Sequence, residues 1–140
     1  MASVDVEALR TVAPISSFLV ALPPNDPFVT PQRSRLKARY RSEALPYCLG
    51  VIVVDGEMVG AGWGHYKRRY VHIEDLNMEP SIVHDPPWMD RVLEELEAHV
   101  GAAHVPVHIY SINGAAEAPW TAEILTRNGY VRQAGYYVKE

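Results

Sequence analysis

One hairpin motif constrains this chain more than any other feature of its sequence. The runs 47–54 and 58–66 are rich in β-branched and small apolar residues, and the pair Asp55-Gly56 separates them. An Asp-Gly pair between two such runs is the strongest short-range signal for a tight turn, because both of its central positions need positive φ. The sequence therefore predicts an antiparallel hairpin at the centre of the chain and excludes an all-helical fold.

The run 70–78 predicts a third strand, but its alternation contains a fault. Val71 and Ile73 are apolar at odd positions, whereas Leu76 and Met78 are apolar at even positions. In a regular strand these two pairs would face opposite sides of the sheet. One extra residue near Glu74-Asp75, a β-bulge, would return all four to one buried face. The alternative is a strand that is buried on both faces.

Helices and further strands are predicted on both sides of this central unit. A helix starts at Asp85-Pro86-Pro87, carries apolar residues at helical spacing and ends at Gly101. We therefore expect a single domain over residues 1–140, of the α/β (α+β) class, with a mixed sheet flanked by helices. The other predicted elements are a strand or helix start over 4–11, helices over 30–44 and 119–127, and strands over 105–112, 130–133 and 136–139.

Composition narrows the class of protein. Of the 140 residues 48% are hydrophobic and 21% are charged, which is normal for a soluble globular domain. The net charge of −4 argues against nucleic acid as a partner. The single cysteine, Cys48, allows neither an internal disulfide nor a cysteine-based zinc site. Apolar runs are too short to span a bilayer, and the acidic N-terminus does not resemble a signal peptide, so we expect a cytoplasmic protein.

Three stretches together resemble the GNAT N-acetyltransferase superfamily over nearly the whole chain. The hairpin VIVVDGEMVGAGWG looks like the second and third strands of that family, and HIEDLNMEP looks like its fourth strand. AEILTRNGYVRQAGYYVKE looks like its last helix, with Gly129-Tyr130 as the typical ending. The resemblance implies a GNAT-like mixed sheet with a bulged, splayed fourth strand. Here the fourth strand is expected to part from the fifth near 107–109.

The resemblance also implies acetyl-CoA or another acyl-CoA as cofactor, yet the pyrophosphate motif is degenerate. The family has a glycine-rich turn at the start of the helix after the fourth strand, whereas this chain has HDPPWMDRVL. Pro86 and Pro87 carry no N–H to donate, and Asp85 would repel phosphate. Leu125 also stands where the family often has a general-acid tyrosine.

Candidate site residues follow from the bulge and from the resemblance. Glu74, Asp75 and His72 are the candidate acid–base groups, because a carboxylate or imidazole at a cleft can take a proton from an amine. An exposed acidic pair or a salt bridge to Arg68 or Arg69 is the structural alternative for the carboxylates. The family pattern implies cofactor contacts at Asn77, Met78, Trp88, Met89 and Asn113, and substrate contacts are expected at His65, Tyr40 and Tyr110.

Three functions remain open from the sequence. The first is an acyl-CoA-dependent N-acyltransferase acting on a small-molecule amine, with the backbone N–H groups near Asn77 and Met78 holding the thioester carbonyl. The second is a GNAT-fold enzyme that no longer uses CoA and does acid–base chemistry on a small metabolite. The third is a non-catalytic binding module. No metal is expected, since no H-x-H or H-E-x-x-H pattern is present, and a homodimer stays open.

Overall fold

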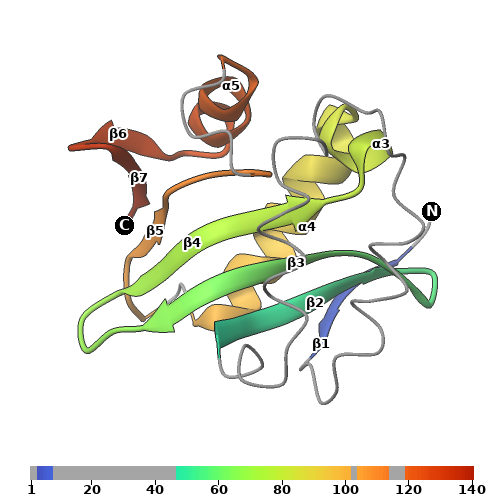
Figure 1. The fold of residues 1–140 in the computed structure, drawn as a ribbon, viewed down its shortest axis with the longest axis horizontal. Helices are drawn as coiled ribbons and strands as arrows, with labels where there is room; N and C mark the ends of the chain where they lie inside the picture. Colours follow the sequence, from blue (N-terminus) through green and yellow to red (C-terminus); the bar gives the residue numbers. More distant parts are fainter. Residues whose placement is uncertain (1–2, 8–46, 102–103, 114–118) are drawn as a thin grey trace.

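A computed structural model describes residues 3–7, 47–101, 104–113 and 119–140 of the chain. The expected helix over 30–44, with Tyr40, lies outside these residues. Within them the strands form one mixed sheet in the order β1-β2-β3-β4-β5-β7-β6 (Figure 1). Only the β4–β5 pair is parallel, and all other neighbours are antiparallel. The strands are β1 (Val4–Glu7), β2 (Cys48–Val54), β3 (Glu57–Tyr66), β4 (Val71–Met78), β5 (Val107–Ile109), β6 (Val131–Gln133) and β7 (Tyr136–Lys139).

The hairpin predicted from Asp55-Gly56 joins β2 and β3. Asp55 has φ 50° and Gly56 has φ 82°, so both central residues adopt the positive φ that a two-residue hairpin turn requires. Ser3 at the start of β1 donates its amide to the Asp55 carboxylate at 3.2 Å, which ties the neighbouring strand to the same turn. The prediction of a central antiparallel hairpin is therefore confirmed.

Helix α4 (Pro86–Val100) covers one face of the sheet and lies behind β3 and β4 in Figure 1. It begins at the cap Asp85 and ends at Gly101, which has φ 87°, so both predicted ends are confirmed. Its apolar stripe is buried against the strands, because 3.6-residue spacing places those side chains on one side of the helix. The buried apolar residues of the stripe are Met89, Val92, Leu93, Leu96 and Val100.

Close packing of α4 depends on small residues in β3. Gly60, Gly62 and Gly64 occupy alternate positions, so they share one face of the strand. A Cβ built on Gly62 would lie 3.5 Å from Leu96 of α4, which places Gly62 beneath the helix, whereas Gly60 and Gly64 lie against β4. On the opposite face of the sheet, Trp63 and Ala61 are buried in a second, smaller cluster.

Two short helices complete the described part of the chain. Helix α5 (Pro119–Arg127) has the predicted bounds. Helix α3 (Pro80–Val83) was not predicted, because a single turn that follows β4 directly is too short to leave a helical period. Its bonds return to Glu79, whose carbonyl accepts from the amides of Ile82 and Val83 at 3.0 and 3.2 Å. None of the helices in the described ranges is long and apolar enough to cross a membrane.

Candidate functional site

The predicted bulge lies in β4. Trp63 pairs with Asp75 and the next residue of β3, Gly64, pairs with Ile73, so Glu74 is the extra residue of β4. The bulge returns Leu76 to the buried face that Ile73 occupies, which explains the fault in the sequence alternation. A Cβ at Gly64 would collide with the backbone carbonyl of His72. The bulge therefore requires glycine on the opposing strand.

The regular ladder between β4 and β5 ends at Ile109, close to the predicted point of parting, but the two strands do not stay apart. Val71, His72 and Ile73 pair in parallel with Val107–Ile109. Beyond them the regular ladder is interrupted, but the amide of Tyr110 still donates to Ile73 O at 2.9 Å. The two strands meet again at a bridge between Leu76 and Ile112. The register is the same at the Ile73–Ile109 pair and at the Leu76–Ile112 bridge, so the two strands stay in step across the interruption.

Asn113 closes the end of this strand pair. Its side-chain oxygen accepts from the Met78 amide at 2.7 Å, and its side-chain nitrogen donates to the Met78 carbonyl at 3.2 Å. The Asn113 carboxamide thus forms the two hydrogen bonds with Met78 that the backbone of a neighbouring strand residue would otherwise form. The Met78 N–H, expected to hold a thioester carbonyl, already has a partner. The backbone of Asn77 points to β3, where it pairs with Ala61, because successive residues of a strand alternate their bonding side.

Asp75 lies in a buried polar cluster at the bulge. Its carboxylate accepts from the Ser111 hydroxyl at 2.7 Å and from the Asn77 side-chain amide at 2.6 Å, one bond to each oxygen. The Ser111 hydroxyl also lies 3.0 Å from the carbonyl oxygen of Glu74. Only 1% of the surface of Asp75 is exposed. Its hydrogen bonds therefore link β4 to the segment after β5, and its carboxylate is not open to a substrate.

Glu74 differs from its neighbour because its side chain is exposed. It shares the sheet face opposite α4 with His72, which is partly buried. Tyr110, expected to contact substrate, is 44% exposed. These three side chains are the sequence-predicted groups that remain accessible around the bulge.

Three imidazoles form a row across neighbouring strands, which we call the imidazole row. His65 of β3 pairs with His72 of β4, and His72 pairs with His108 of β5. Direct cross-strand partners point to the same side of a sheet, so all three rings lie on the face opposite α4. Among the described residues no group of three or more histidine, cysteine, aspartate or glutamate side chains is arranged to hold a metal ion.

Tyrosine rings hold two members of the imidazole row. His108 is stacked on Tyr70, with ring centroids 4.1 Å apart, and on Tyr136, with centroids 4.9 Å apart. His65 meets the ring of Tyr47 edge-on, with centroids 4.9 Å apart. Burial lowers the pKa of His72 and of His108 below the ordinary value of 6.5, so both are mainly neutral near pH 7 and able to accept a proton.

The start of α4 offers no donor to a pyrophosphate. Pro86 and Pro87 occupy the first two helical positions and have no N–H. The Trp88 amide faces the Asp85 carboxylate at 3.5 Å, and the Met89 amide donates to the Asp85 carbonyl at 3.0 Å. The Asp85 amide itself donates to the Ile82 carbonyl at 3.1 Å, so the four amide positions that a helix start leaves free, 85 to 88, are either without an N–H or used. The backbone amides of Trp88 and Met89, which were expected to contact the cofactor, therefore already have partners within the chain.

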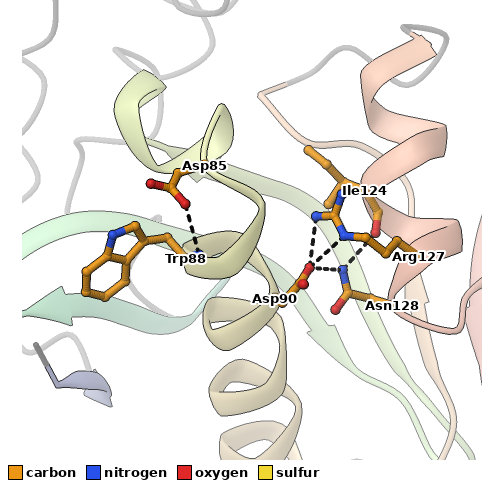
Figure 2. A network of polar contacts seen from close by, with 6 residues as sticks. All are labelled: Asp85, Trp88, Asp90, Ile124, Arg127 and Asn128. Carbon is orange, nitrogen blue, oxygen red and sulfur yellow. Dashed lines mark hydrogen bonds and ion pairs between the residues drawn. The ribbon is translucent and has the colours of Figure 1, made fainter. Parts of the chain in front are cut away.

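Figure 2 shows how the first turn of α4 is fixed from both sides. Asp85 caps the turn, while Asp90 accepts from Arg127 of α5 and from the neighbouring Asn128. The Asn128 side chain also donates to the Ile124 carbonyl at 2.8 Å. The helix start is held against α5 by protein groups alone.

Sequence reasoning found some of these residues and missed others. It selected His65, His72 and Glu74, which the sheet face opposite α4 brings together. It missed His108, Tyr70, Tyr136 and Ser111, because their proximity depends on the pairing of β4 with β5 and β7. Cys48 gives no nucleophile, since burial raises the pKa of its thiol to about 11.

Comparison with known proteins gives a structural match only. No protein-family model matches the chain, and no curated protein resembles it significantly in sequence. The chain is similar in structure to the PaiA N-acetyltransferase of Thermoplasma acidophilum, solved in complex with coenzyme A, with a TM-score of 0.64 and 10% identity. The match covers 97% of this chain and 96% of that one. The mixed sheet and its helices therefore have the GNAT N-acetyltransferase fold.

Proposed function

We propose that this chain uses the N-acetyltransferase fold for acid–base chemistry on a small molecule and does not hold CoA at the start of α4. The observation that carries the proposal is the first turn of that helix. Pyrophosphate binding there depends on free backbone N–H groups and on the positive end of the helix dipole. Pro86 and Pro87 supply no N–H, and the Asp85 carboxylate occupies the remaining positive end.

His72 is the proposed proton acceptor. Its imidazole is partly buried, its pKa is lowered by that burial, and it shares its face of the sheet with the exposed side chains of His65 and Glu74. A neutral imidazole can take a proton from a bound substrate and return it later in the reaction. Glu74 is a second candidate because it is exposed at the bulge and its charge favours the protonated form of His72. His65 would contact the substrate from the neighbouring strand.

A second candidate function is acyl transfer from an acyl-CoA to a small-molecule amine. It is favoured by the fold match to an N-acetyltransferase that was solved with coenzyme A. Such an enzyme would have to hold CoA by a path that avoids the first turn of α4 and the Met78 amide. Among the described residues, those at the start of α4 and at Met78 do not provide the usual path, so we derive no step through the cofactor.

Calorimetry with acetyl-CoA and with free CoA separates the two functions. We expect no binding heat at millimolar ligand. A dissociation constant below about 100 μM, equivalent to about 5.5 kcal/mol, would instead favour acyl transfer. Asp85→Asn serves as the companion variant, because it removes a negative charge from the helix start but keeps a capping side chain. If CoA binds at α4, this variant binds it more tightly than the wild type does.

A further inference from the structure

We infer that the imidazole row of His65, His72 and His108 binds an oxyanion, the carboxylate or phosphate group of a small ligand, centred on His72. The inference rests on the proposed function, since it names the class of ligand that the same sheet face would take. It starts from the strand register, which places His72 between the other two imidazoles.

The ring nitrogens of the row are available to a ligand. Among the described residues none of these three imidazoles has a hydrogen-bond partner, although each ring carries two polar nitrogens. The stack of His108 between Tyr70 and Tyr136 covers the faces of the imidazole ring. The nitrogens of an imidazole lie in the ring plane, so stacking leaves their donor and acceptor directions open. The tyrosines therefore orient His108 without using its polar atoms.

A cluster of positive charge lies at one end of the row, and its Lys67 acts on the charge of His72. Lys67, Arg68 and Arg69 form the exposed turn between β3 and β4, next to His65. Within the described part of the chain none of the three takes part in an ion pair. An anion at the row would meet these cations as well as the imidazoles, and a field of one sign raises the local concentration of the opposite ion.

The charges that face His72 can be named from each described element around it. Glu74 of β4 attracts a proton, whereas His65 of β3, Lys67 of the turn and His108 of β5 repel one. His108 in turn faces Glu140 beyond β7. Apart from Glu74, every neighbour with an influence on His72 is cationic or becomes cationic in acid, so a bound anion would replace repulsion by attraction.

Anion binding and proton uptake are therefore coupled. Burial keeps the pKa of His72 and His108 low in the free protein, and a bound anion favours the protonated imidazoles and raises both pKa values. Affinity for the anion must then increase as the pH falls from about 7.5 to about 6.

Nitrogen-15 NMR of the imidazoles tests this inference on the whole chain. Inorganic phosphate and malonate are titrated separately at about pH 6 and about pH 7.5, so the two arms distinguish a phosphate from a carboxylate ligand. We expect the signals of the row to shift. Malonate, which stays largely ionised over this range, should bind at least about fivefold more tightly at the lower pH, since one coupled proton gives at most tenfold per pH unit. The signals of the exposed His104, which lies outside the row, should not move.

Variants sharpen the same titration. His72→Gln and Lys67→Gln should each weaken binding severalfold, while the matched control His104→Gln leaves it unchanged. A thermal melt of each variant shows whether it is folded. The inference is overturned if the row does not respond to tens of millimolar of either anion, or if His104 shifts equally. Because this readout involves neither CoA nor turnover, tight CoA binding would defeat the proposed function and leave the anion result standing.

Discussion

At the scale of single residues, Asn113 decides whether the usual cofactor path along β4 exists in this chain. Its φ of 50° lies in the left-handed region, which asparagine tolerates better than most residues. That conformation accompanies the two side-chain bonds to the amide and carbonyl of Met78. One residue thereby closes the strand pair just beyond the Leu76–Ile112 bridge and satisfies the backbone amide and carbonyl of Met78.

Replacing Asn113 tests this role. Asn113→Ala should lower the free energy of unfolding by about 2 kcal/mol or more, because it leaves two buried backbone groups of Met78 without partners. Asn113→Gly loses the same bonds but accepts the left-handed backbone, so the difference between the two variants reports strain alone. Urea unfolding gives the stabilities, and hydrogen exchange of the Met78 amide reports the lost bond. Wild-type protection of that amide in the glycine variant would disprove the assignment.

Gly64 is the second residue at the site that cannot be substituted without disturbing the bulge. Gly64→Ala should lower the free energy of unfolding by at least about 2 kcal/mol, because the new Cβ collides with the carbonyl of His72 at the bulge. Gly62→Ala in the same strand is the matched control, since its Cβ would meet Leu96 at an ordinary contact of 3.5 Å. Equal stability of the two variants in urea would show that the bulge can relax.

At the scale of elements, α4 is built as a structural helix from its first residue. The Asp85 cap uses the amides at the helix start that could bind an anion, and the two prolines have no amide N–H to offer. The contact with α5 fixes the same end of the helix. Arg127 and Asn128 hold Asp90 against the far helix (Figure 2). This pairing is partly exposed, with 33% and 43% of the Arg127 and Asp90 side chains accessible, so its contribution to stability is modest.

The Asp90 contact gives a pH-dependent prediction. Although partial burial opposes the effect, hydrogen bonds from Arg127 and Asn128 lower the pKa of Asp90 below its ordinary value of 3.8. A lowered folded-state pKa means that the contribution to stability is complete above about pH 5 and is lost as the pH falls through and below 3.8. Wild type should therefore be more stable than Asp90→Asn at pH 6, and this difference should shrink toward pH 3. A difference that is independent of pH in thermal melts would contradict the assigned contact.

At the scale of the whole molecule, the features that the sequence predicted correctly are those that a few neighbouring residues determine. Asp55-Gly56 placed the hairpin, Asp85 and Gly101 placed both ends of α4, and the fault after Ile73 placed the bulge. Each of these depends on a few adjacent residues whose backbone preferences are strong.

Contacts between residues that lie far apart in the sequence could not be predicted from such local signals. The bridge that rejoins β5 to β4 beyond the bulge has no signature in 105–112. The carboxylate of the buried Asp75 is paired with Ser111, 36 positions away. The clustering of His108 with His65 and His72 likewise follows from strand order, which no single segment encodes. A side-chain amide that substitutes for strand backbone, as in Asn113, also looks like any other polar residue in a sequence.

A CoA titration followed through the backbone amides of α4 by nitrogen-15 NMR shows directly whether the start of this helix binds a pyrophosphate. We propose that the start of α4 has no pyrophosphate-binding site, although the chain has the N-acetyltransferase fold. We predict that the amide signals of Trp88, Met89, Asp90 and Arg91 stay in place at millimolar CoA. Saturable shifts confined to these amides, absent when CoA is replaced by an equal concentration of inorganic phosphate, would contradict the account.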